Sequence, residues 1–322
     1  MSELDNRTDG MTAALRKWAH DRGYRVAWGS AKVVLQAQLE IRERHSSQQL
    51  DQVLYDAELA AVADTEQPSD AVSVVVVAMP RPAHRVAFEL ADGRFEALLP
   101  PTYFRYRPKF EEVRQDLACN GLPGSRIEHL TGPLKATAAR LGLVRYGRNN
   151  LTYSPGFGSY QQLCGYFTDA ELAVSNGTRQ HEPSLLPECD GCDRCRAACP
   201  TNSISENQVL IHAEHCLTFA NENPGTWPDW VPARAHSCLL GCLACQRSCP
   251  ANPKLQVVDS GVTFSREESD ALLNGRRTSL SEVNGIKNKL AWIGQPFAEP
   301  LIGRNLRALV DKRVNRTYRN RD

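Results

Sequence analysis

The chain has 322 residues, which is long enough for two domains with sizeable hydrophobic cores. Lys and Arg total 38 against 37 Asp and Glu, so the nearly neutral charge excludes a strong overall field that would attract nucleic acid or a membrane surface. No stretch approaches the roughly 18 consecutive apolar residues of a membrane span, and the N-terminus is polar, so we expect no membrane segment, no secretion signal and a reducing cytoplasmic location.

Residues 1–180 have the pattern of an α/β domain. A short strand is predicted over 24–28, and apolar residues at helical spacing predict an amphipathic helix over 50–61. Residues 72–79 read VSVVVVAM and end at Pro80. This continuous run of β-branched residues predicts a central strand that is covered on both faces.

A hairpin is predicted next, because 86–90 and 95–99 flank the turn signal Asp92-Gly93. The same periodicities predict helices over 103–118 and 134–141 and strands over 143–146 and 159–167. The polar, proline-bearing stretch 176–187 is interpreted as a linker into a second domain, which we place at 181–256.

Nine of the chain's eleven cysteines lie between Cys189 and Cys249. The first run is Cys189-x2-Cys192-x2-Cys195-x3-Cys199-Pro200, and the second is Cys242-x2-Cys245-x3-Cys249-Pro250. The first spacing is the bacterial ferredoxin pattern for [4Fe–4S] clusters. Structural zinc sites pair two Cys-x2-Cys knuckles instead, and disulfides need an oxidising compartment. The pattern therefore predicts two [4Fe–4S] clusters, and hence one-electron chemistry.

In this pattern the fourth cysteine of each run binds the other cluster. We therefore assign Cys189, Cys192, Cys195 and Cys249 to cluster one. Cluster two receives Cys199, Cys242, Cys245 and either Cys216 or Cys238, between which the spacing does not decide. The two isolated cysteines, Cys119 and Cys164, are expected to be small buried residues.

Residues 257–322 are predicted to form a short helical C-terminal segment. Ile286, Leu290 and Ile293 share one helical face. The basic end, 302–322, is interpreted as a solvated helix rather than a nucleic-acid patch. We detect no internal sequence repeat.

The first domain also offers a place for a second cofactor. It lacks a Gly-x-Gly-x-x-Gly fingerprint at a strand–helix turn, which argues against a built-in NAD(P)H site. The loop over 147–169 is rich in glycine and small polar residues and lies between two predicted strands. Such a loop lets the backbone approach a large flat ligand closely.

Two further segments belong with the residues quoted so far: ARLGLVRYGRNNLTYSPGFGSYQQLCGYFTD and HCLTF. In all of these the chain resembles the epoxyqueuosine reductase family. The resemblance implies an α+β chain in which a nitroreductase-like cobalamin-binding domain is followed by a bacterial two-[4Fe–4S] ferredoxin domain. It implies Cys216 as the fourth ligand of cluster two and an external ferredoxin or flavodoxin as the low-potential electron donor. It also suggests four cobalamin-binding residues: Arg148, Asn149, Gly158 and Ser159.

One departure from the family concerns the proton donor. The family's Asp-Ser/Thr-Gly-Pro motif carries an acidic residue, whereas here the motif begins with Leu130, and leucine cannot donate a proton. Replacement candidates are Tyr103 and Tyr106, whose phenol pKa values neighbouring arginines would lower, and His129. The sequence therefore favours a reductase with a different, small-molecule substrate. A tRNA epoxyqueuosine reductase with a relocated acid and an electron-transfer or cobalamin-reactivating protein are the alternatives.

Overall fold

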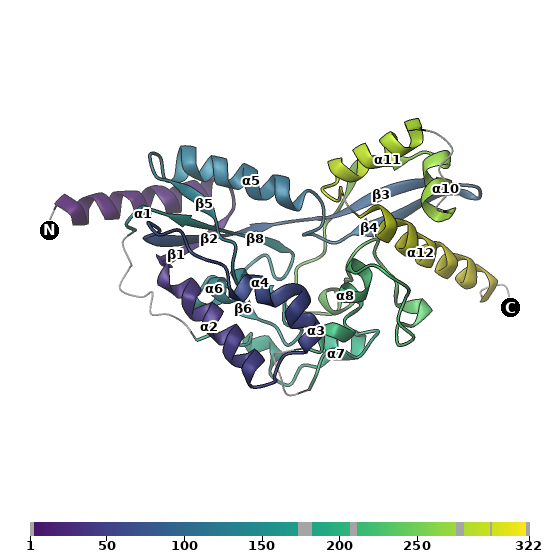
Figure 1. The fold of residues 1–322 in the computed structure, drawn as a ribbon, viewed down its shortest axis with the longest axis horizontal. Helices are drawn as coiled ribbons and strands as arrows, with labels where there is room; N and C mark the ends of the chain where they lie inside the picture. The colour runs from purple at the N-terminus through teal and green to yellow at the C-terminus, as the bar shows by residue number, and fades with distance from the viewer. Residues whose placement is uncertain (1–2, 173–181, 207–210, 275–279, 297, 320–322) are drawn as a thin grey trace. The chain divides into compact units, whose positions relative to one another are not determined.

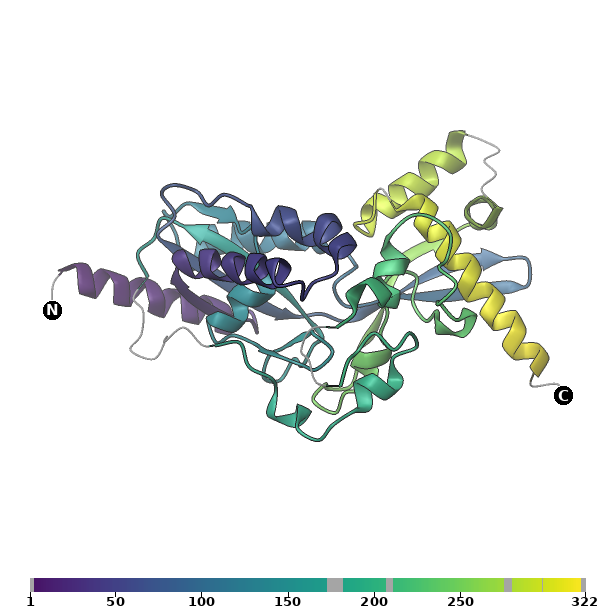
Figure 2. The same ribbon diagram turned by 60° about the horizontal axis from the view of Figure 1, so that its bottom comes forward.

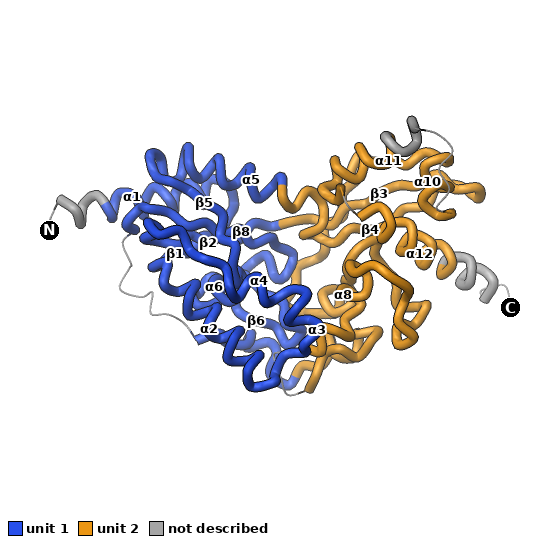
Figure 3. The backbone as a smooth tube through the Cα atoms, in the orientation of Figure 1, with its two compact units in different colours: residues 1–80, 108–191 blue, residues 81–107, 192–322 orange. Residues whose placement is uncertain are grey.

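The computed structural model describes residues 3–172, 182–206, 211–274, 280–296 and 298–319. The chain forms two compact units, residues 1–80 with 108–191 and residues 81–107 with 192–322 (Figure 3). The sequence-based division at 180 and 256 differs from these units. The boundary at 180 lies among residues 173–181, which are not described. The predicted hairpin and the C-terminal segment both lie in unit 2.

A four-stranded antiparallel sheet forms the centre of unit 1 (Figure 1). Its strands lie in the order β1 (Arg25–Ser30), β2 (Ser73–Pro80), β8 (Gln161–Thr168) and β5 (Ile127–His129). Every residue of β2 except Pro80 is buried, and β2 pairs with β1 on one side and β8 on the other. The predicted central, doubly covered strand is therefore confirmed.

Helices cover both faces of this sheet. Successive β2 side chains point to opposite faces, so alternate valines pack against different helices. The odd-numbered valines of β2 pack with Leu15 of α1 and Val113 of α5. The even-numbered valines pack with Val34 of α2 and Ala138 of α6. The bounds of these helices are α1 Glu3–Asp21, α5 Tyr106–Asp116, α2 Lys32–Ser46 and α6 Leu134–Arg140.

The smaller elements of unit 1 connect these layers. The helix predicted over 50–61 is confirmed as three consecutive turns with a π-helical centre. The elements are α3 Gln52–Leu54, η1 Tyr55–Leu59, α4 Ala60–Ala63, η2 Leu117–Gly121, β6 Arg145–Tyr146, β7 Thr152–Tyr153 and η3 Pro187–Cys189. Strands β6 and β7 pair with each other and bracket residues 147–151, the first part of the glycine-rich loop.

Unit 2 is built on the predicted hairpin, β3 (Ala83–Leu90) and β4 (Gly93–Leu99). A third strand, β9 (Val257–Phe264), runs parallel to β3. Phe88 and Phe264 stack across these two strands with ring centroids 4.9 Å apart. The C-terminal segment, predicted as helical only, thus begins with a strand that completes the sheet.

Three helices bury the apolar side of this sheet (Figure 2): α10 Arg266–Asn274, α11 Leu280–Trp292 and α12 Glu299–Arg319. Ile286, Leu290 and Ile293 are buried there, as their common face predicts. Short helices carry the rest of the unit: α7 Arg194–Ala198, η4 Ala213–His215, α8 Leu217–Glu222, η5 Ala233–Ala235 and α9 Ala244–Arg247. None of the described helices is long and apolar enough to cross a membrane.

Candidate functional site

Two cysteine-bearing segments, 191–202 and 241–252, share one backbone design. Each begins with a left-handed glycine, Gly191 at φ 63° and Gly241 at φ 66°. In each, the residue before the short helix has φ −116°, at Asp193 before α7 and at Leu243 before α9. The segments are therefore an internal repeat, and the expectation of no repeat is wrong.

The two segments also end alike. A proline follows the last cysteine, and the asparagine two positions later donates its N–H to that cysteine's carbonyl, at 3.5 Å for Asn202 to Cys199 and 3.2 Å for Asn252 to Cys249. All eleven cysteines are free thiols, and of the two isolated ones Cys164 is buried as predicted, whereas Cys119 is exposed, so the expectation for Cys119 is wrong. Within the described part of the chain, no three His, Cys, Asp or Glu side chains converge closely enough to hold a single metal ion.

Cys199 lies among hydroxyl groups that favour its thiolate. Ser203 Oγ lies 3.3 Å and Thr201 Oγ1 lies 3.7 Å from its sulfur. Burial alone would raise the pKa of Cys199, but these hydrogen bonds outweigh it and lower the pKa. A thiolate is the form that binds iron, so this environment suits the predicted crossing ligand.

The two candidates for the fourth ligand of cluster two differ in burial. Cys238 is only 1% exposed, and burial raises the pKa of its thiol to about 12. Cys216 is partly exposed, and burial also raises its pKa. The charge of Cys199 acts on both Cys216 and Cys242, so these three sulfurs lie near each other. Of these three charges, that of Cys242 acts on Cys238. This arrangement supports Cys216, which stays a prediction.

Helix α8 presents Cys216, which is its N-terminal cap residue. Arg304 of α12 fixes the opposite end of α8. Its guanidinium donates to the carbonyls of Ala220 at 2.9 Å and Asn223 at 2.9 Å and lies 4.0 Å from the ring centroid of Trp227. The C-terminal helix therefore holds a predicted ligand segment in place, a role that sequence reasoning missed.

The glycine-rich loop of unit 1 is a tight, internally bonded turn. Gly147 N–H donates to Leu151 carbonyl at 2.8 Å, and Asn150 N–H donates to Gly147 carbonyl at 2.9 Å. Asn149 is buried, and its amide donates to the Tyr153 hydroxyl at 3.0 Å. Asn149 thus shapes the loop from within, and its role in cobalamin binding stays a prediction.

Two cations border this loop. Arg148 donates to the backbone carbonyl of Cys189 at 3.0 Å and so ties the loop to the first predicted iron ligand. Lys135 of α6 donates to Asn150 Oδ1 at 2.8 Å and to its carbonyl at 3.1 Å. Lys135 reaches solvent but is closely surrounded by protein, and this desolvation lowers its pKa to about 8.

The far side of the loop holds a buried acceptor without a partner. Gly158 has φ 58° and exchanges two backbone hydrogen bonds with Ser154, and Ser159 beside it is buried. Gln161 is 4% exposed and uses its amide N–H on Thr152 carbonyl at 3.0 Å. Its Oε1 has no hydrogen-bond partner among the described residues. A buried acceptor left open is costly, so a ligand that donates a hydrogen bond fits here.

The three candidate proton donors lie in separate environments. Tyr103 donates its hydroxyl to Glu222, and burial followed by the Glu222 charge raises its pKa well above the ordinary value. The expectation that neighbouring arginines lower this pKa is therefore wrong. Tyr106 is exposed at the start of α5.

His129, at the end of β5, belongs to a surface cluster. Its Nε2 lies 3.0 Å from Glu111 Oε2, and its ring centroid lies 5.0 Å from that of Phe110. Hydrogen bonds from Arg114 first, then from Gln115 and His129, lower the pKa of Glu111 to about 2. His129 therefore faces a permanent carboxylate partner.

Comparison with known proteins places the cysteine repeat in a named family. The family model of the 4Fe-4S double cluster binding domain matches residues 188–252. The epoxyqueuosine reductase of Staphylococcus aureus is 32% identical over 133 residues, which are 41% of this chain and 33% of that protein. That of Synechococcus sp. is 30% identical over 176 residues, 54% of this chain and 48% of that protein. Over these residues the chain is similar to the epoxyqueuosine reductases.

Solved epoxyqueuosine reductases share the fold over most of the chain. The enzyme from Streptococcus thermophilus has a TM-score of 0.62 at 17% identity and covers 91% of this chain and 79% of its own. An epoxyqueuosine reductase solved with an epoxyqueuosine-modified tRNA stem loop has a TM-score of 0.63 at 18% identity, with coverage of 94% and 80%. The sequence matches span only a third to a half of the curated relatives.

Leu130, the first residue of the Leu-Thr-Gly-Pro segment, is part of the core. Leu130 is 5% exposed and packs with the cluster of buried residues under α6 and α2. Its N–H donates to Gly165 carbonyl at 2.8 Å, which continues the pairing of β5 with β8. Leu130 is therefore an apolar packing residue that joins β5 to the layer of α2 and α6.

Proposed function

We propose that this chain is a cytoplasmic, cobalamin-dependent iron–sulfur reductase that acts on a small-molecule substrate. The observation that carries the proposal is the contact between the glycine-rich loop and the first predicted iron ligand, in which Arg148 donates to the Cys189 backbone carbonyl. When bound, the two clusters and the corrin supply one-electron reduction, with electrons from a ferredoxin or flavodoxin.

The chain's own residues fit such a cofactor. Within residues 147–159 only Pro155 and Gly156 are exposed, whereas Gly158 and Ser159 are buried, and Asn149 fixes the shape of the loop from inside. The open Gln161 Oε1 would accept a hydrogen bond from a peripheral corrin amide, and Lys135 and Arg148 would border the same loop. Gly158 and Ser159 stay predicted cobalamin-binding residues.

The apolar Leu130 argues for a substrate other than epoxyqueuosine, because opening an epoxide needs a proton for the departing oxygen. A tRNA epoxyqueuosine reductase with its acid at Tyr103, Tyr106 or His129 is the second possibility. A protein that only transfers electrons or reactivates cobalamin is the third, and it needs no proton donor at all.

Metal and corrin content tests the proposal most directly. The full chain would be purified and reconstituted without oxygen and offered hydroxocobalamin. We expect about eight irons and about one cobalt per chain. Eight irons with no retained cobalt would rule out the cobalamin reading and leave an electron carrier.

Turnover then separates the three functions. With titanium(III) citrate as reductant, conversion of an epoxyqueuosine-modified tRNA stem loop would favour the second. Reduction of cobalamin without turnover of epoxide or aryl halide probes would favour the third.

A further inference from the structure

Tyr103 is fixed in unit 2 by its backbone. Its N–H donates to Pro100 carbonyl at 3.0 Å, and its own carbonyl accepts from Gln295 Nε2 at 2.9 Å. Two residues on, Arg105 N–H donates to Ile293 carbonyl at 2.8 Å. The end of α11 therefore holds the loop after β4 in a defined position and aims its tyrosine.

The side chain of Tyr103 joins two segments of the chain. Its ring lies directly on Gly241, where an added Cβ would be 2.7 Å from Cζ and 2.8 Å from Cε2. Its hydroxyl donates to the carboxylate of Glu222. Only glycine suits position 241, both for its left-handed φ and for the space that the ring occupies.

Both segments carry predicted ligands of cluster two. Glu222 is the last residue of α8, the helix that Cys216 caps, and Gly241 directly precedes Cys242. The charges of Cys216 and Cys238 add to burial and Glu222 in raising the Tyr103 pKa, so these sulfurs lie within electrostatic reach of the ring. Asn221 closes the same bridge by donating to Gly241 carbonyl at 3.0 Å.

The ring is not needed to make the turn. The equivalent turn at Gly191 has almost the same φ, yet among the described residues no atom outside its neighbours lies within 4 Å of an added Cβ. Of the two repeated segments, only the one that begins at Gly241 is covered by the ring of Tyr103. An aromatic ring laid on a ligand turn keeps water away from it.

We propose that Tyr103 is a cover for cluster two that lowers its reduction potential by excluding water from the Gly241–Cys242 turn. Reduction adds one electron to a cluster that is already anionic with four thiolates, and a drier surrounding stabilises the added charge less. This rests on the two-cluster part of the proposed function, but on neither cobalamin nor a substrate.

The test is a redox titration of the reconstituted full chain with dithionite, followed by EPR. Cys242→Ser identifies the signal of cluster two, because both ligand assignments include Cys242. Tyr103→Ala is expected to raise the reduction potential of cluster two by ~59 mV. For a one-electron reduction this is about a tenfold change in the equilibrium constant. Tyr103→Phe keeps the ring and should shift the potential far less. Tyr55→Ala, which removes a half-buried tyrosine from unit 1, is the control and should shift neither potential.

Several results would overturn the proposal. Unchanged potentials in Tyr103→Ala with full iron content would exclude a cover. An equal shift in Tyr103→Phe would assign the effect to the hydroxyl and Glu222 instead. If Tyr103→Ala loses iron, Tyr103→Leu replaces it, and loss of cluster two from both would make the ring an assembly element. Iron content, measured separately, distinguishes each result from failure of the proposed function.

Discussion

The Leu130 side chain lies over the Cα atom of Gly165, where an added Cβ would be 2.7 Å from Leu130 Cδ2. Leu134 approaches the same point from α6, with its Cδ1 2.6 Å from that position. The strand β8 can pass this close to the helix only because residue 165 has no side chain. Packing therefore leaves no room beside Leu130 on this side of β8.

This packing predicts that an acidic residue at position 130 destabilises the fold. Leu130→Asp should lower the free energy of unfolding by about 3–5 kcal/mol, because it removes buried apolar surface and buries a carboxylate. Urea denaturation with the cysteines kept reduced measures this change in the free energy of unfolding. The control is Thr131→Asp at the exposed neighbouring position, which should change stability by less than about 0.5 kcal/mol. A mild Leu130→Asp variant that gained epoxyqueuosine turnover would contradict both the packing argument and the proposed substrate class.

The ligand of cluster two can be decided by iron content. Cys216→Ser should leave about four irons per chain, whereas Cys238→Ser should keep about eight. The reason is that Cys216 lies near both Cys199 and Cys242, while Cys238 is only 1% exposed. Cys164→Ser, at a buried cysteine of unit 1, is the control and should also keep eight. Loss of four irons from Cys238→Ser alone would reverse the assignment.

The cysteine spacing and the β2 run were enough to predict the double cluster and the doubly covered strand. Both are local patterns, because each is formed by residues that are close together in the sequence. The strand β9 was missed because Asp259, Ser260 and Gly261 interrupt its apolar pattern, and its pairing with β3 shifts register between Arg85 and Ala87. Only the partner strand makes this segment extended.

The repeat, by contrast, is visible in the sequence, because Gly191 and Gly241 lie 50 positions apart and each begins the same Gly-Cys-x2-Cys-x3-Cys-Pro-x-Asn pattern. The proposed role of Tyr103 could not be read from the sequence, because Glu222 and Gly241 are distant in the chain. Arg105 and Arg107 beside it suggested a lowered pKa, whereas burial and Glu222 raise it.

Lys135 should titrate near pH 8. Its rate of acetylation by acetic anhydride, followed by mass spectrometry between pH 6 and 10, should reach half its maximum at about pH 8 in the folded chain. In the denatured chain the midpoint should be near the ordinary value of about 10.4. Hydroxocobalamin should slow the folded-state reaction if the 147–159 loop holds the corrin, and equal rates with and without it would contradict that placement.

The same lysine affects stability with a defined sign. Its folded pKa lies below its unfolded pKa, so the unfolded chain binds more protons between about pH 8 and 10.4. This group therefore makes the folded state relatively more stable as the pH rises through that window. Lys135→Met should remove this dependence, and urea denaturation at pH 7.5 and 10 in both proteins would detect it.

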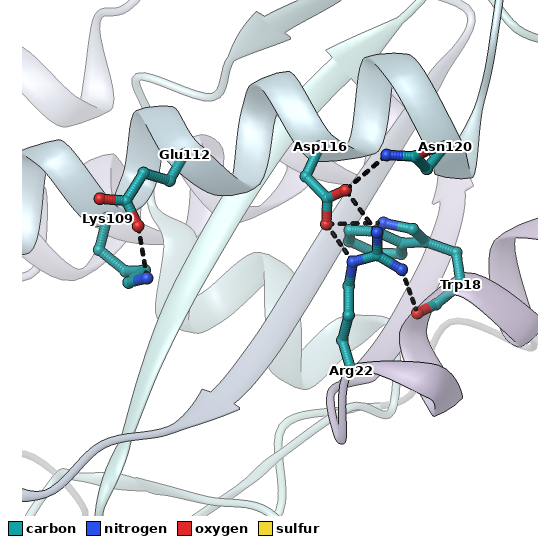
Figure 4. A network of polar contacts seen from close by, with 6 residues as sticks. All are labelled: Trp18, Arg22, Lys109, Glu112, Asp116 and Asn120. Atoms are coloured by element: carbon teal, nitrogen blue, oxygen red, sulfur yellow. Dashed lines mark hydrogen bonds and ion pairs between the residues drawn. The ribbon is translucent and has the colours of Figure 1, made fainter.

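Asp116 ties α1 to α5 in unit 1 (Figure 4). Its carboxylate accepts from Arg22 at 2.5 Å, from Asn120 at 2.7 Å and from Trp18 Nε1 at 3.1 Å. Burial acts to raise the pKa of Asp116, but the hydrogen bond from Arg22 and the others outweigh it and lower the pKa. The Asp116 and Arg22 side chains are only 28% and 30% exposed, so solvent screens the pair incompletely.

Asp116→Asn should therefore lower the free energy of unfolding by about 1–2 kcal/mol at pH 7. A carboxylate whose folded pKa is lowered stabilises the fold above its unfolded pKa of about 3.9, and this stabilisation disappears as the pH falls through the folded pKa. The difference between wild type and Asp116→Asn should accordingly shrink below about pH 4. Glu112→Gln is the control on the same helix, because its more exposed pair with Lys109 should contribute less than about 0.5 kcal/mol. Equal losses in the two variants, or a difference independent of pH, would show that the Asp116 network does not join the helices as its geometry indicates.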